Sequence, residues 1–145
     1  MVKVLVKKLD QNIKLPFYKT PQSSGMDLMA INQKQITINP GGKEIIPTGL
    51  SVAIPKNYEI QIRPRSGLAA KKGISVLNTP GTVDSDYRGE IKIILINLSK
   101  ESFVVKSGDR VAQMILCPVS RAKLEEVKDL PKTLRGREGF GSTGK

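Results

Sequence analysis

Short apolar stretches, each broken by glycine, proline or asparagine, run along most of the chain. In the first of them Val4 and Val6 alternate before a pair of lysines. Apolar, β-branched stretches of this length with frequent turn signals are typical of β-strands. We therefore predict strands over residues 2–9, 35–38, 43–46, 50–54, 58–63, 74–77, 90–98, 102–105 and 110–116.

Helical periodicity is nearly absent. The one helix that we predict covers residues 66–72, where Leu68, Ala69 and Ala70 precede two lysines and Gly73 provides a stop. Many short strands and one short helix indicate an all-β sandwich or barrel. Within it, residues 91–96 are almost continuously apolar, so we expect this strand to be buried on both sides, in the core or at a subunit interface.

The C-terminal tail differs from the rest of the chain. No alternating pattern follows Pro131, and residues 135–144 contain four glycines and one aromatic residue. Such a segment buries too little apolar surface to compensate for its ordering entropy, so we expect a mobile arm that only a ligand orders. Composition alone leaves two interpretations open. One is a frayed terminus, and the other is a nest of amide and hydroxyl donors for phosphate oxygens.

Composition excludes several kinds of chemistry. The 145 residues include no histidine and one cysteine, Cys117, which excludes a histidine-based triad and argues against a zinc site. The net charge of +11 favours an anionic partner, although scattered solvated lysines explain it equally well. Only 4% of residues are aromatic, so we expect no stable nucleic-acid complex. No apolar run is long enough for a membrane span or a signal peptide, so we expect a cytoplasmic protein.

Two polar segments indicate a phosphate site and a source of acid–base chemistry. Arg63 and Arg65 lead into the predicted helix, whose first turn holds Ser66 and Gly67. Free N–H groups at a helix start bind anions, although serine is also an ordinary N-cap residue. Residues 78–90 carry three carboxylates. Without histidine, an aspartate is the best available general base, although aspartate also favours turns.

Two further polar segments are weaker signals. Residues 108–114 place Arg110 and Gln113 in an otherwise apolar strand, which suggests either an exposed edge or the polar lining of a pocket. Residues 23–28 form a turn that carries one acid, Asp27.

Taken in order, these segments resemble the five motifs of the trimeric dUTPase family. The matching segments are residues 24–28, 64–69, 81–90, 108–113 and 135–144. The resemblance implies a jelly-roll-like β-sandwich over residues 1–130 and a lid over the active site at 131–145. It also implies a homotrimer with shared active sites, which hydrolyses dUTP to dUMP and pyrophosphate with Mg²⁺. Hydrolysis of dUTP keeps uracil out of DNA and supplies dUMP for thymidylate synthesis.

The same resemblance implies roles for individual residues. Asp84 would activate the attacking water at the α-phosphate, and Asp27 would support the water shell of the metal. The base and sugar would contact Asn78, Gly81, Val83, Tyr87, Ile93 and Phe140. The phosphates would contact Arg65, Ser66, Gly67, Gln113, Arg135, Gly141, Ser142 and Thr143.

One residue departs from the family pattern, and three other functions compete. The family commonly has glycine where this chain has Glu138, which would be strained if the position needs a positive φ. Its carboxylate would repel the triphosphate or pair with Arg137.

The competing functions are a dCTP deaminase, alone or combined with dUTPase activity, a regulatory protein-binding module of the same fold, and a nucleic-acid binder.

Overall fold

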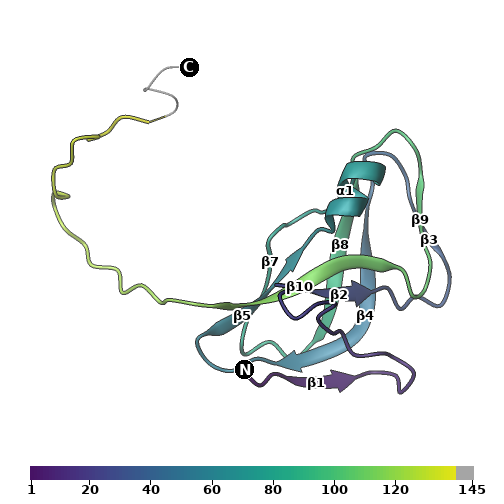
Figure 1. Cartoon of the computed structure of the whole chain (residues 1–145). Coiled ribbons are helices and arrows are strands. Elements are labelled where there is room, and N and C mark those ends of the chain that lie inside the picture. The colour runs from purple at the N-terminus through teal and green to yellow at the C-terminus, as the bar shows by residue number, and fades with distance from the viewer. Residues whose placement is uncertain (140–145) are drawn as a thin grey trace.

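The computed structural model describes residues 1–139, and residues 140–145 lie outside the described part. Two four-stranded antiparallel sheets and a two-stranded ribbon make up the fold (Figure 1). The strands are β1 (Leu5–Lys8), β2 (Met26–Met29), β3 (Ile36–Ile38), β4 (Lys43–Ala53), β5 (Tyr58–Arg63), β6 (Ile74–Val76), β7 (Gly81–Val83), β8 (Glu90–Asn97), β9 (Phe103–Val105) and β10 (Arg110–Pro118). The sheet orders are β1-β4-β8-β6 and β2-β10-β5-β7, and β3 pairs with β9.

The core lies between the two four-stranded sheets. Alternate side chains of β8 point inward, and Ile91, Ile93 and Leu95 are almost fully buried. The facing sheet contributes Leu28 from β2 and Ile60 from β5 to the same cluster. One cluster shared by two antiparallel sheets is the arrangement of a β-sandwich. The prediction of an all-β fold with one short helix is therefore confirmed.

The helix α1 (Ser66–Lys72) has the predicted bounds. Gly73 ends it in the left-handed region at φ 63°, where its N–H bonds the carbonyls of Ala69 and Leu68. The N-cap residue is Arg65 and no side chain caps the helix, so the interpretation of Ser66 as the N-cap is wrong. Ser66 is instead the first helical residue, with an exposed side chain.

The proline and glycine at 47–49 do not divide two strands, as the sequence predicted. β4 continues through them with a register shift between Pro47 and Ser51. Hydrogen bonds to side chains replace the interrupted backbone pairing there. The Thr48 hydroxyl donates to the Ile91 carbonyl at 2.6 Å, and the Gly49 N–H donates to Glu90 Oε1 at 2.8 Å. The turn signal has produced a bulge inside a long strand.

Two other predictions about strands need correction. Residues 81–83 lie outside the strands that we predicted, but they form β7, which pairs with β5. Burial of β8 on both sides is also wrong for a single chain. Ile94 and Ile96 on its outer face are only half-buried, and Ile45, paired with Ile94, is 58% exposed. The outer face of β4 and β8 is therefore apolar but partly exposed to solvent, and it is not part of the core.

Residues 119–139 leave the sandwich at the end of β10 and run away from it as an extended segment (Figure 1). The last hydrogen bond to the sandwich joins the Val119 N–H to the Asn57 carbonyl at 2.8 Å. Beyond it, no hydrogen bond links the described part of the tail to the rest of the chain. Within residues 1–139, no helix is long and apolar enough to cross a membrane.

Candidate active site

The predicted site residues fall into two groups, and strand β5 determines how far apart they lie. Val83 pairs with Ile60 near the start of β5, so Asp84 lies beside Tyr58 and Glu59. Arg65 follows the other end of the strand. A strand rises about 3.3 Å per residue, so the backbones at Glu59 and Arg65 are separated by roughly 20 Å.

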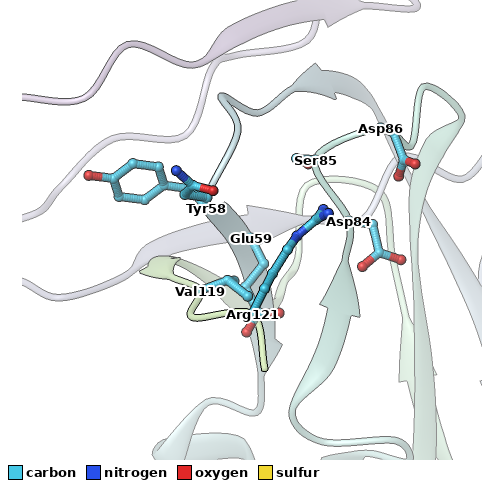
Figure 2. Close-up of a pocket in the computed structure, with 8 residues that line it drawn as sticks. Tyr58, Glu59, Asp84, Ser85, Asp86, Val119 and Arg121 are labelled. Carbon is cyan, nitrogen blue, oxygen red and sulfur yellow. The ribbon is translucent and has the colours of Figure 1, made fainter. Parts of the chain in front are cut away.

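The first group surrounds Asp84. A cavity of about 240 Å³ lies on one side of this residue, between the start of β5 and the segment that follows β7. Figure 2 shows the Arg121 guanidinium reaching from beyond β10 toward Asp84 and Ser85. Glu59 and Asp86 also line this cavity, so it holds three carboxylates and one guanidinium. The Asp84 side chain is exposed, and its carboxylate has no hydrogen bond or ion pair within residues 1–139.

A second cavity, of about 220 Å³, lies on the other side of Asp84. Tyr87 lines it together with Thr82, Val83 and residues at the start of β8. The Tyr87 hydroxyl donates to the Glu90 carbonyl at 3.0 Å, and its ring lies against Gly89. A Cβ at Gly89 would lie 2.6 Å from the ring carbon Cζ, so this position requires glycine for the ring to stay in place.

The other predicted base and sugar contacts are spread around β7 and β8. A Cβ at Gly81 would lie 3.1 Å from the Asn78 side-chain nitrogen, so these two residues are close neighbours. Val83 is 8% exposed and lines the second cavity. Ile93 is 1% exposed and its side chain packs in the core, away from both cavities. Phe140 lies outside the described residues.

The second group gathers around Asp27 on β2 and is called the arginine cluster below. Arg65 Nε donates to Asp27 Oδ1 at 3.0 Å, and Arg110 Nη1 donates to Asp27 Oδ2 at 3.1 Å. Asp27 is opposite Gln113 in the pairing of β2 with β10, and Gln113 Nε2 donates to the Pro64 carbonyl at 3.0 Å. Residues from three separate motifs therefore meet at one end of the sandwich, directly before Ser66 and Gly67.

The arginine cluster is suited to an anion. One carboxylate between two guanidinium groups leaves a net charge of +1. A cavity of about 390 Å³ adjoins both arginines, and Asp109, whose Oδ2 accepts from the Lys106 N–H, also lines it. Charge-assisted donors of this kind bind phosphate oxygens.

The described tail residues contact neither group by a hydrogen bond. Arg135 is exposed, and its Nε donates to the Glu138 carbonyl at 2.9 Å. Glu138 has no positive φ, because Asn57 is the one non-glycine residue in that region within the described chain. The strain considered for Glu138 is therefore absent, and residues 1–139 contain no ion pair between Glu138 and Arg137. Gly141, Ser142 and Thr143 lie outside the described residues.

Reasoning from the sequence missed three features of the site. It left Arg110 open as an edge or pocket residue without predicting that its side chain binds Asp27, and it assigned no role to Arg121, which lines the cavity beside Asp84. It also missed Gly25, where a Cβ would lie 2.7 Å from Gln113 Oε1. All three depend on strand pairing between distant segments, for which a single sequence carries no signal.

Known proteins resemble this chain along nearly its whole length. A sequence model of the dUTPase family matches residues 11–144. A deoxyuridine 5'-triphosphate nucleotidohydrolase of Rickettsia bellii is 55% identical over 145 residues, covering 99% of this chain and 97% of that protein. The enzyme of the same name from Rickettsia prowazekii is 52% identical and covers 99% of this chain and 98% of its own length.

Solved structures with lower sequence identity share the fold. A mutant dUTPase of Staphylococcus bacteriophage 80alpha, solved with dUpNHpp, superposes with a TM-score of 0.87 at 23% identity, covering 98% of both chains. A mutant dUTPase from phage phi11 of S. aureus, described with a structural Mg(II) ion, superposes with a TM-score of 0.80 at 20% identity, covering 90% of this chain and 99% of its own.

Proposed function

Because the chain belongs to the dUTPase family, we propose that it hydrolyses dUTP to dUMP and pyrophosphate through the two groups described above. Family membership and enzymatic character were both predicted, and both are confirmed. The observation that carries the proposal is the arginine cluster. Asp27, Arg65 and Gln113 belong to three motifs far apart in the sequence, and hydrogen bonds join all three segments beside a cavity that Arg65 and Arg110 line.

Asp84 is the general base in this proposal. Its carboxylate accepts a proton from a water molecule, the water oxygen forms a bond to the α-phosphorus, and the bond to the bridging oxygen of pyrophosphate breaks. The exposed carboxylate, without a partner in the described chain, supports this role. A positioned general base contributes about 10²- to 10⁴-fold to a rate.

Arg65, Ser66, Gly67 and Gln113 bind the phosphates. Donors fixed before the reaction stabilise the charge that develops in the transition state without having to reorganise. Arg65 and Gln113 satisfy this requirement, because hydrogen bonds to Asp27 and to the Pro64 carbonyl hold them in place.

Uracil and deoxyribose occupy the cavity beside Tyr87, with Asn78, Gly81 and Val83 around the base. Tyr87 excludes a 2′-hydroxyl, and Phe140 stacks on the base. A site that pairs the hydrogen-bonding edge of uracil rejects cytosine, because the wrong edge leaves buried groups unpaired. Ile93 supports the pocket from the core, since its side chain reaches neither cavity.

The site would hold Mg²⁺ through the phosphates of the substrate. No group of three acidic, cysteine or histidine side chains within residues 1–139 forms an all-protein cage. Mg²⁺ usually keeps several waters and binds substrate phosphates together with one or two carboxylates. Asp27 is the carboxylate that would contact its water shell. When bound, the ion neutralises charge on the triphosphate.

The active sites are shared between the subunits of a homotrimer. Asp84 lies beside one end of β5 and Arg65 follows the other end, so their backbones are separated by roughly 20 Å, which exceeds the length of a triphosphate chain. The half-exposed apolar residues Ile45, Ile94 and Ile96 on the outer face of β4 and β8 support an interface between copies.

Subunit complementation tests the shared site. Asp84→Asn and Arg65→Gln subunits, each inactive alone, are denatured together and refolded as mixed oligomers. If the sites are shared, some of them combine an intact Asp84 with an intact Arg65, and part of the activity returns. Mixtures that form oligomers without recovering activity would show that each chain carries a complete site.

Residues 131–145 form a lid, distinct from the domain of residues 1–130. Arg135, Gly141, Ser142 and Thr143 close over the terminal phosphate. The absence of hydrogen bonds between the described part of the tail and the sandwich supports a segment that orders on substrate. In the cell, we expect a cytoplasmic enzyme without a stable nucleic-acid complex, which keeps uracil out of DNA and supplies dUMP for thymidylate synthesis.

A pyrophosphate-release assay with dUTP, dTTP, dCTP and UTP tests the function. We expect turnover of dUTP alone, and near-complete loss of turnover in Asp84→Asn with retained binding of dUTP. Ammonia released from dCTP would identify a deaminase instead. Salt-dependent DNA binding without turnover would favour a nucleic-acid binder.

A further inference from the structure

Arg110 has two contacts with the residues around it. Its side chain donates to Asp27 Oδ2, and its backbone carbonyl accepts a hydrogen bond from Arg65 Nη1 at 3.2 Å. Asp27 accepts from Arg65 through its other oxygen. The three residues therefore form a closed circuit in which Arg110 holds Arg65 directly through its backbone and indirectly through Asp27.

We propose that Arg110 is a positioning residue, which fixes the Arg65 guanidinium in the orientation that binds phosphate. An arginine has five N–H donors. Arg65 uses one on Asp27 and one on the Arg110 carbonyl, which leaves three for a ligand. The two bonds act on different nitrogens, so together they set both the place and the plane of the group. This inference rests on the proposed function, because it assumes that Arg65 contacts the substrate.

A β-bulge places Arg110 on the face where Asp27 lies. Asp27 is opposite Gln113, and the pairing shifts by one residue between Arg110 and Ala112, so that Arg110 is opposite Met29. Side chains alternate between faces with a period of two. In regular pairing Arg110 would oppose Ala30, on the other face from Asp27. The extra residue turns the Arg110 side chain to the face of Asp27. Bulges often redirect a side chain in this way.

The circuit is partly exposed, which bounds the expected effect. Side-chain exposure is 26% for Arg65, 22% for Asp27 and 49% for Arg110. A hydrogen bond to a charged group is worth more than a neutral one, but exposure screens it. We expect Arg110→Gln to weaken binding of the imido analogue dUpNHpp on the order of 10-fold, with kcat changing less than KM.

A double-mutant cycle tests the proposal in the full-length enzyme. Arg110→Gln, Arg65→Gln and the double variant are compared by calorimetric titration with dUpNHpp and Mg²⁺. For wild type and Arg110→Gln, kcat and KM for dUTP are measured as well. If Arg110 acts through Arg65, its removal adds less than about 2-fold once Arg65 is gone. Arg110→Lys keeps the charge but loses the planar fork, so it should recover only part of the affinity.

Lys106→Gln is the matched control, because it removes one positive charge from the turn before β10 without touching the circuit. It should leave affinity and turnover unchanged. Three results would overturn the proposal: additive losses in the cycle, unchanged affinity in Arg110→Gln, or a lower melting temperature without a change in affinity. A wild-type enzyme that neither hydrolyses dUTP nor binds dUpNHpp would instead refute the proposed function. The cycle would then be read with tripolyphosphate as the probe, and absence of binding to it would refute the inference as well.

Discussion

Gly25→Ala adds a single methyl group and should weaken phosphate binding strongly. It directly precedes β2, and a Cβ there would lie 2.7 Å from Gln113 Oε1 and 3.2 Å from Ile115 Cγ1. Gly25 has no positive φ, so the backbone itself tolerates alanine. Ile115 is buried in the sheet, whereas Oε1 is the end of a flexible side chain. In Gly25→Ala, Gln113 should therefore move and Ile115 should stay.

The displacement has two energetic consequences. Moving Gln113 breaks its hydrogen bond to the Pro64 carbonyl, which should lower the free energy of unfolding by about 0.5–1.5 kcal/mol. If Gln113 also donates to a phosphate oxygen, the substrate loses a hydrogen bond to a charged group, worth about 1.5–3 kcal/mol. At about 1.4 kcal/mol per factor of ten, kcat/KM for dUTP should fall by roughly 10- to 150-fold.

Steady-state hydrolysis of dUTP and thermal unfolding of the same preparations measure the two effects separately. Gln113→Ala supplies the control background, because Gly25→Ala should cause little further loss of kcat/KM once the amide is absent. Wild-type kcat/KM in Gly25→Ala would refute the reasoning. So would an equal loss in both backgrounds, which would mean that alanine acts through the backbone or through Ile115.

Four other changes test separate parts of the structure. Gly89→Ala should displace the Tyr87 ring and lower the preference for dUTP over UTP, measured as a ratio of kcat/KM values; an unchanged ratio would contradict the role of Tyr87. Asn97→Ala removes a fully buried amide that donates to two carbonyl groups, and should cost about 2–4 kcal/mol in urea unfolding, whereas a wild-type midpoint would contradict this. Ile94→Lys should dissociate the proposed trimer in analytical ultracentrifugation, and a wild-type sedimentation coefficient would contradict an interface at this face. Deletion of residues 135–145 should leave a folded oligomer with very low activity.

The sequence predicted what depends on local chemistry. The helix at 66–72 was correct to the residue, because Gly73 ends it through its own conformational freedom. Most strands were correct to within a few residues, because alternation reports burial within each strand. The turn signal at Pro47–Gly49 misled, because the hydroxyl of Thr48 and the carboxylate of Glu90 hold the bulge together, and Glu90 is distant in sequence.

The arrangement of the site could not be predicted from the sequence, because it also depends on contacts between distant segments. The five ordered motifs predicted candidate site residues, but not which of them meet. Asp27 and Arg110 meet only because β2 pairs with β10 in a register that contains a bulge, and no property of either segment alone specifies that register. Arg110 was therefore interpreted as either an edge residue or a pocket residue, and the structure places it at the pocket beside Arg65.

If the active sites are shared as proposed, strand β5 explains why motifs that are close in sequence would serve one site from two chains. The segment between Arg65 and Asp84 contains α1, β6 and β7, and it returns antiparallel to β5, so Asp84 finishes at the end where β5 began. A mutation that loosened the segment between Arg65 and Asp84 would not bring these two residues together, because the pairing of Ile62 with Gly81 lies between them. The only way to place an intact Asp84 beside an intact Arg65 without unfolding the sheet is to supply one of them from another copy. A stable monomer should therefore keep the fold and the arginine cluster and lose turnover.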